Sequence, residues 1–454
     1  MPTAPDAVAR ATGLRKQGRY GQAMQVLRGV LADRADRAAA LEAARVLTDV
    51  CSYVDAWELS RTHLDRDLED VDALILRSEI RCGLGRIAAG VDDATAATVL
   101  APSYAPAWSQ LAAARWIACD GSGSARALRE ALRLDPDDVA ALNGLEPLAE
   151  RAWPILRAAA DRNADDALRL VAVALSCAGL GDLREARRYA DRALVVDPDR
   201  DEARIMDGWL HLHEGRFEDL ERVATQLLAE LDSGVAHWLR AYALYAQARL
   251  DEAVAEFDHA IAQAPAEIDS LRVRGDVQFH RGRWADAVRD AGAVLDRKPD
   301  DVEARLLRAR ARVALDDNGA ALRDIAAVLA ADAGHAEALT LRADIKLLDG
   351  DDAGALVDVD RALGTGTASV DALLTCGLAL TRLQRNYDAA AAFRAVLELD
   401  PRNEPAARHL ALATRLWRRH PRGMAAAIAD VSVGGTALAI ILGVGPVTGR
   451  PGSS

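Results

Sequence analysis

The stretch Val370–Asn403, VDALLTCGLALTRLQRNYDAAAAFRAVLELDPRN, decides the fold. It begins with a run of small and apolar residues, passes through a short polar turn, and continues into a second run with the apolar spacing of an amphipathic helix. It closes with Asp400-Pro401, and Pro cannot continue a helix. The pattern therefore predicts two helices joined by a tight turn.

The same 34-residue pattern recurs along the chain. Leu or Trp stands near the fourth position, Gly or Ala at the eighth, Ala at the twentieth, and a large apolar residue or Ala at the twenty-fourth. These landmarks place repeats at 4–36, 37–70, 71–104, 105–138, 167–200, 201–233, 234–267, 268–301, 302–335, 336–369 and 370–403. Period and pattern resemble the tetratricopeptide repeat, which implies an all-α, right-handed α-solenoid of helix–turn–helix units.

The regular repeats fall into two arrays, at 4–138 and 167–403. Residues 139–166 are shorter than a full repeat and contain Pro147 and Pro154, each of which should end or kink a helix. We expect a degenerate repeat that joins the arrays, either as a hinge or as a rigid kink. In the repeat at 105–138, the segment 120–124, DGSGS, predicts a flexible loop between the two helices.

The C-terminal end changes character after the last repeat. Residues 404–420 predict a capping helix, because a solenoid must cover its last apolar face. The tail 421–454 is apolar and Gly-rich, and 431–447 carries no charge over ~17 residues, the lower limit for spanning a bilayer. Two interpretations of this tail are open. It is a membrane segment at 424–447, or it is an apolar tail that packs on the last repeat or stays loosely ordered.

Composition narrows the function. The net charge of −13 disfavours nucleic acid as a partner, since phosphate neutralisation needs a basic surface. The five cysteines form no CxxC pair and the N-terminus has no apolar signal segment, so we expect a cytoplasmic protein. No Lys follows a Gly, which excludes a P-loop, and His211 and His213 should point to different helix faces. We expect no catalytic site, cofactor or metal.

Five repeats carry Arg at the seventh position and an acid at the twenty-third, on the two helices of one hairpin. Most other repeats lack both, although Arg10 stands at the seventh position of the first repeat without a matching acid. Guanidinium and carboxylate groups that face each other can form two parallel hydrogen bonds. The predicted pairs are Arg77–Asp93, Arg240–Glu256, Arg274–Asp290, Arg308–Asp324 and Arg342–Asp358.

The resemblance also implies that the first helix of each repeat lines a concave groove. For a chain with 4% aromatic residues, the groove positions of 201–301 are rich in rings. They are either binding anchors or spacers between neighbouring first helices. The candidates are Trp209, His213, Trp238, Tyr242, Tyr245, Phe279 and His280.

We therefore expect a non-enzymatic scaffold that binds a protein or peptide segment in its groove. Glu202 and Asp276 line the same stretch, which favours a neutral or mildly basic segment over an acidic one. One alternative is a scaffold tethered to a membrane by the tail. Another is a regulatory array that controls a separate enzyme or transcription factor.

Overall fold

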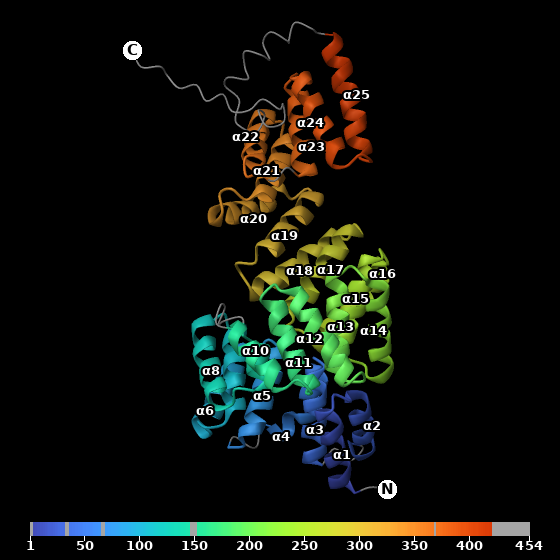
Figure 1. The fold of residues 1–454 in the computed structure, drawn as a ribbon. Coiled ribbons are helices and arrows are strands. Elements are labelled where there is room, and N and C mark those ends of the chain that lie inside the picture. Colours follow the sequence, from blue (N-terminus) through green and yellow to red (C-terminus); the bar gives the residue numbers. More distant parts are fainter. Residues whose placement is uncertain (1–2, 32–35, 65–68, 146–151, 367–368, 420–454) are drawn as a thin grey trace, which may run out of the picture. The chain divides into compact units, whose positions relative to one another are not determined.

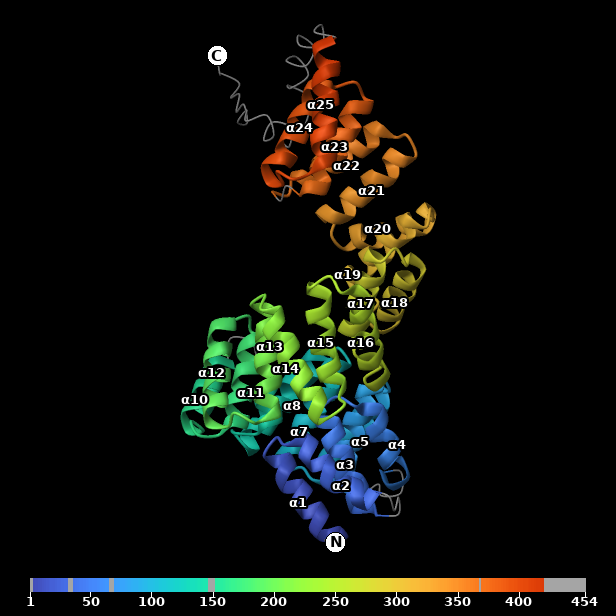
Figure 2. The same cartoon turned by 90° about the vertical axis from the view of Figure 1, so that its right-hand side faces the viewer.

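The computed structural model describes residues 3–31, 36–64, 69–145, 152–366 and 369–419. These residues form 25 helices and no strand, so the all-α prediction is confirmed for the described part of the chain (Figures 1 and 2). The chain divides into two compact units, residues 1–277 and residues 278–454, with the boundary inside α17. The predicted junction at 139–166 and the predicted capping helix at 404–420 therefore lie in different units. The apolar tail at 421–454, with its possible membrane segment at 424–447, falls outside the described residues.

The first unit is a series of antiparallel helix pairs that pack in chain order. Its helices are α1 (Ala4–Lys16), α2 (Tyr20–Leu31), α3 (Arg37–Asp49), α4 (Tyr53–Leu64), α5 (Val71–Gly83), α6 (Ile87–Leu100), α7 (Ala105–Ile117), α8 (Gly121–Leu134), α9 (Val139–Asn143), α10 (Ala152–Arg162), α11 (Ala167–Gly179), α12 (Leu183–Val196), α13 (Asp201–His213), α14 (Phe217–Glu230), α15 (Gly234–Ala246), α16 (Leu250–Gln263) and most of α17 (Ile268–His280).

The second unit continues the same pattern. Its helices are α18 (Trp284–Arg297), α19 (Val302–Ala314), α20 (Asn318–Ala331), α21 (Ala336–Leu348), α22 (Asp352–Leu363), α23 (Val370–Arg382), α24 (Asn386–Leu399) and α25 (Glu404–Arg419).

The first helices begin where local sequence signals place them. Asp70, Asp301 and Ser369 each precede such a helix, and their side chains accept a hydrogen bond from the backbone N–H three residues on. This capping satisfies a donor that the helix itself leaves unpaired. In consequence α5, α19 and α23 start at the first residue of a predicted repeat, as the other first helices do.

The landmark at the eighth position reflects close helix packing. Gly377 on α23 faces Phe393 on α24, and a Cβ atom at Gly377 would lie 2.6 Å from Phe393 Cε1. Phe393 is fully buried at the twenty-fourth position of the same repeat. A small residue at position eight therefore makes room for the ring or methyl group of position twenty-four.

Two segments differ from the regular pattern. The short region 139–166 contains a five-residue helix, α9, and the helix α10 in place of a full pair. The loop predicted at 120–124 is wrong: Asp120 caps α8 by accepting from the Gly123 N–H at 2.8 Å, and 121–124 form the first helical turn. A favourable N-cap outweighs the low helix propensity of Gly and Ser here.

In the structure Arg77, Arg240, Arg308 and Arg342 each contact the acid that the sequence pairs with them. Arg77, Arg308 and Arg342 each donate two parallel hydrogen bonds to their acid, at 2.6–3.0 Å. Arg240 contacts Glu256 through a single pair of atoms at 3.1 Å. For Arg274, the contact within the first unit is with Asp258 at 2.6 Å.

A second cation accompanies three of these pairs, one helical turn further along the first helix. Arg81, Arg312 and Lys346 contact Asp93, Asp324 and Asp358 at 2.6–2.8 Å. In the fourth pair His237 Nδ1 lies 2.6 Å from Glu256 instead. Each buried acid is therefore held by two groups of the facing helix.

The last helix, α25, covers the end of the second unit. Ala406 and Ala413 are fully buried against α24, and the His409 ring stacks on Phe393 with centroids 5.3 Å apart. Within the described residues, no helix combines the length and apolarity that crossing a bilayer requires.

The first unit also closes on itself. In both views of Figures 1 and 2, the N-terminal helices (blue) lie beside α13–α16 (green). Helix α2 contacts α14, and α4 contacts α16. We call this line of contact the seam.

Candidate functional site

The first helices of the first unit leave a groove between their inner side chains. Its volume is about 890 Å³, and it is lined from α1, α3, α5 and the start of α7. Leu41, Ile75, Leu76 and Pro106 supply apolar surface to it. The charged residues that line it are Arg15, Lys16, Arg37, Arg45, Glu42, Asp49, Asp72 and Glu79.

Most of the charges in this groove are paired. Arg15 lies 2.8 Å from Glu42 and 3.1 Å from Asp49, and the Tyr104 hydroxyl donates to Asp72 at 3.1 Å. Glu79 makes no hydrogen bond or ion pair to the described part of the chain. Burial, followed by the nearby charge of Asp49, raises the pKa of Glu79 to about 7. Glu79 is thus the acid in this groove that is most readily available to a ligand.

The predicted aromatic residues of the first unit form a half-buried face on α15. Trp238 and Tyr242 meet edge to face with centroids 4.7 Å apart, and Tyr242 also contacts the buried Phe257 at 5.6 Å. Both rings pack against two neighbouring apolar clusters. The Tyr245 hydroxyl donates to the Asp276 carboxylate. These rings bridge adjacent hairpins, and each keeps part of its surface exposed.

The remaining candidate residues lie in two different units of the chain. The rings of Trp209 and His213 on α13 are tilted against each other with centroids 3.9 Å apart, and burial lowers the pKa of His213. Phe279 and His280 belong to the second unit, where the Arg310 guanidinium lies 5.5 Å from the Phe279 ring centroid. The structure therefore gathers Trp238, Tyr242 and Tyr245 on one helix, with Trp209 on the preceding first helix.

The second unit has a smaller groove of its own, with a volume of about 580 Å³ between α19, α21 and α23. Leu341, Leu374 and Leu378 give it an apolar wall. Asp344 accepts a hydrogen bond from the Thr375 hydroxyl at 2.6 Å, and burial raises the pKa of Asp344 to about 6. Neither groove was assigned from the sequence, because which inner side chains meet depends on the packing of several hairpins.

No group of three or more His, Cys, Asp or Glu side chains in the described ranges is arranged to hold a metal ion. The second cations Arg81, Arg312 and Lys346 were also missed by the sequence reading. The signal was present, since each follows the seventh-position Arg by four residues and so lies on the same helix face.

Comparison with known proteins identifies the repeat. The tetratricopeptide repeat family model matches residues 172–219 and 272–315. The APC/C hetero-tetramer Cut9–Hcn1 is similar in structure at 15% identity, with a TM-score of 0.50, covering 83% of this chain and 89% of its own. A tetratricopeptide repeat protein from Parabacteroides merdae aligns at 16% identity with a TM-score of 0.45, covering 55% of this chain and 98% of its own. No curated protein matches the chain.

The repeat signature, the helical hairpins and the family match define a class, the helical-repeat proteins. Within it, the repeat that the family model finds at residues 172–219 and 272–315 is the tetratricopeptide repeat. Proteins of this fold serve as interaction scaffolds, because stacked repeats create an extended concave surface.

Proposed function

We propose that the chain is a non-enzymatic scaffold that binds an extended segment of a partner protein along the concave face of its first unit. The observation that carries this proposal is the groove of about 890 Å³ between α1, α3 and α5. Protein interiors normally fill such space, and an open groove on an inner face is the usual form of a ligand site.

The groove also supports a particular kind of segment. Leu41, Ile75 and Leu76 can take up an apolar side chain, while the unpaired Glu79 can accept from a backbone N–H or a cationic group. Arg15 already forms ion pairs with two acids, so it is less available to bind an acidic ligand. The favoured segment is neutral or mildly basic, with at least one apolar anchor.

The aromatic face on α13 and α15 supplies further anchors in this proposal. Trp238, Tyr242 and Tyr245 are each partly exposed, and such rings bury a large apolar area at little rotameric cost. The same rings also pack between hairpins, so their role as spacers is the competing interpretation.

Partner capture tests the proposal. The tagged full-length protein is used to capture proteins from native extract, and each captured protein is then purified and titrated. We expect the pair of changes Trp238→Ala and Tyr242→Ala to weaken binding by about tenfold or more, with helicity retained. Glu79→Lys, in the groove, should weaken binding of a basic segment by a similar factor. Val195→Ala on α12, where Val195 is 83% exposed, is the matched control.

Each outcome is informative. If Glu79→Lys binds normally while the aromatic variant fails, the segment lies on α13 and α15 alone. If the aromatic variant unfolds, these rings are spacers. Normal binding by both folded variants would refute the proposed face.

The two alternatives remain distinguishable. A membrane-tethered form depends on 424–447, which lies outside the described residues, and cell fractionation tests it directly. A regulatory array would use the same groove, and the identity of the captured partner, an enzyme or a transcription factor, would reveal it.

A further inference from the structure

The seam joins the first three hairpins of the first unit to hairpins that follow much later in the chain. At the first point, the Asp201 N–H donates to the Gly18 carbonyl at 3.0 Å, and the Tyr20 N–H donates to Asp201 Oδ2 at 3.0 Å. At the second, the Gly234 N–H donates to Ser52 Oγ at 3.4 Å. At the third, the Ala266 N–H donates to the Gly83 carbonyl at 3.2 Å.

These three points repeat with nearly constant spacing along the chain. The partners are 181 residues apart for Tyr20 and Asp201, and 182 residues apart for Ser52 and Gly234. In each case the turn inside an early hairpin meets the start of a late one. A solenoid that returns to itself after a fixed number of repeats gives this register, so the first unit forms one closed turn.

The backbones can approach closely at the seam because two of its residues are glycines, which carry no side chain. A Cβ atom on Gly21 would lie 2.7 Å from the Glu230 carbonyl oxygen, and one on Gly234 would lie 2.7 Å from the Cys51 carbonyl oxygen. By contrast, a Cβ atom on Gly29, in the same helix as Gly21, would have no atom of the described residues within 4 Å.

The seam contains many polar groups, and some of them form no hydrogen bond with the described residues. Three of its buried polar atoms, Arg200 Nε, Glu202 Oε2 and Gln263 Oε1, form no hydrogen bond with the part of the chain that the structure describes. The Asp201 carboxylate is buried there as well, and burial raises its pKa to about 6. Leu231 and Val235 provide apolar contact with the N-terminal core. The unpartnered buried groups oppose closure of the seam, and the apolar contact favours it.

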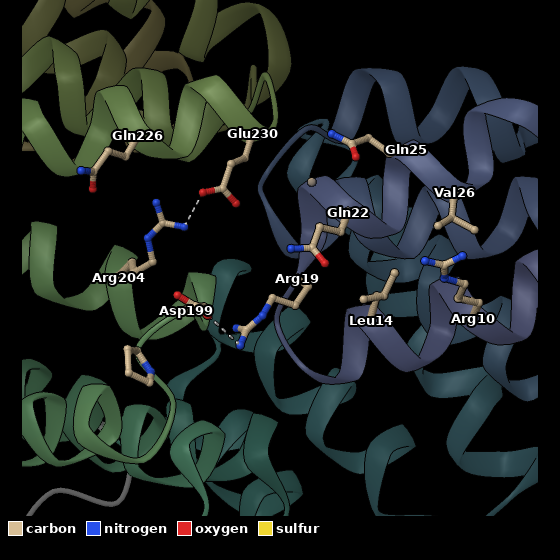
Figure 3. Close-up of a pocket in the computed structure, with 12 residues that line it drawn as sticks. Arg10, Leu14, Arg19, Gln22, Gln25, Val26, Asp199, Arg204, Gln226 and Glu230 are labelled. Atoms are coloured by element: carbon tan, nitrogen blue, oxygen red, sulfur yellow. Dashed lines mark hydrogen bonds and ion pairs between the residues drawn. The ribbon is translucent and has the colours of Figure 1, made fainter.

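Beside the seam lies an open cleft of about 910 Å³ between α1–α2 and α13–α14 (Figure 3). Ion pairs cross or border it: Arg19 with Asp199 at 3.6 Å, and Arg204 with Glu230 at 2.8 Å. The exposed side chains of Gln22, Gln25 and Gln226 face this cleft without filling it. The hairpins therefore meet along an edge and not across a packed face.

We propose that the first three hairpins, residues 4–104, form a clasp that stays packed on α7 but separates from α13–α17 at the seam while both sides stay folded. The clasp is held by backbone hydrogen bonds at three points and by the ion pair of Arg19 at the first. Its release converts the closed turn into an open superhelix and gives access to the inner face.

Two matched glycine variants test the clasp. Gly21→Ala places a methyl group against the Glu230 carbonyl and should shift the equilibrium toward the open form. Gly29→Ala makes the same change in the same helix away from the seam. Because both replacements raise helix propensity alike, their difference isolates the seam.

Two native cysteines provide the readout in the full-length protein. Cys51 lies at the second contact point, and burial raises its pKa to about 11, so its reactive thiolate is scarce in the closed form. Cys119 occupies the equivalent turn with the same φ of 59°, but it is exposed and away from the seam. Cys177 is buried inside a hairpin and reports unfolding.

Labelling with a small maleimide, followed by mass spectrometry, gives the rate at each cysteine. We expect Cys51 to label faster in Gly21→Ala by about tenfold or more, with Cys119 and Cys177 unchanged and Gly29→Ala like the original. If Cys51 labels no faster in Gly21→Ala, the seam does not open there. If Cys51 and Cys177 label together, the seam opens only on unfolding, and the clasp is refuted.

Discussion

Asp324 receives three hydrogen bonds from two arginines of the facing helix. Arg308 donates from Nε at 2.9 Å and from Nη2 at 2.6 Å, and Arg312 donates from Nη1 at 2.6 Å. The Asp324 side chain is 6% exposed and each arginine side chain is 23% exposed. The acid is therefore inside the hairpin while its cations reach water, which lowers the cost of burying them.

In this arrangement the acid contributes more to the stability of the hairpin than either arginine does. We expect Asp324→Ala to lower the free energy of unfolding by about 2–4 kcal/mol, because it leaves two guanidinium groups without their acceptor. Arg308→Ala should cost less, roughly 1–2 kcal/mol, since Arg312 still pairs with Asp324. Denaturant unfolding of both single variants and of the double variant measures the coupling.

The control for this cycle is Arg323→Ala, next in sequence to Asp324 but exposed, which should change stability by less than about 0.5 kcal/mol. Additive costs for Arg308→Ala and Asp324→Ala would mean that the pair contributes no interaction energy.

At the scale of the helices, local signals explain most of the agreement between sequence and structure. Capping residues, turn residues and the eighth-position glycine act within one hairpin, and they are readable from a few neighbouring positions. The segment 120–124 shows where composition misleads, because one good cap at Asp120 outweighed two glycines and two serines. The array boundaries at 138 and 167 remain predictions.

The helix α25 should stabilise the second unit without help from the residues beyond it. Truncation after Gly423 should leave the helical circular dichroism and the melting temperature unchanged, because Ala406, His409 and Ala413 already cover the end of α24. Truncation after Asn403 removes this cover and should lower the melting temperature by roughly 5 °C or more. Aggregation of the longer product would show that the tail belongs to the core.

At the scale of the whole first unit, the sequence predicted a groove but not its place between α1, α3 and α5, and it predicted neither the seam nor how much of each ring is exposed. These features depend on how small rotations between successive hairpins add up, and no short stretch of sequence records that sum. The predicted aromatic residues illustrate the difference: contacts with two neighbouring hairpins set how much of the Trp238 and Tyr242 rings is exposed.

Burial of two carboxylates, Glu79 in the groove and Asp201 at the seam, should give the stability of the first unit an unusual pH dependence. The pKa of Glu79 is raised to about 7 and that of Asp201 to about 6, mainly by burial. An acid with a raised folded-state pKa stabilises the fold at low pH and loses that contribution as pH rises through this pKa. Acidification from pH 7.5 to 5.5 should therefore raise the melting temperature.

Glu79→Gln should raise the melting temperature at pH 7.5 by about 2 °C and reduce its change with pH. Glu130→Gln is the control: this partly exposed acid lies on α8, hydrogen bonding to Arg133 lowers its pKa, and its replacement should leave the slope intact. A melting temperature that falls between pH 7.5 and 5.5 would mean that these carboxylates are fully hydrated.

The 181-residue separation across the seam has a consequence for how the protein is made. Hairpins of a repeat protein can fold as they leave the ribosome, since their contacts are local. The seam cannot, because Tyr20 must wait for Asp201 to be synthesised. At ~5–20 residues per second, the early hairpins spend roughly 10–40 s with their turn edges unpaired. During synthesis the nascent first unit is thus an open array, and only its later hairpins can close it.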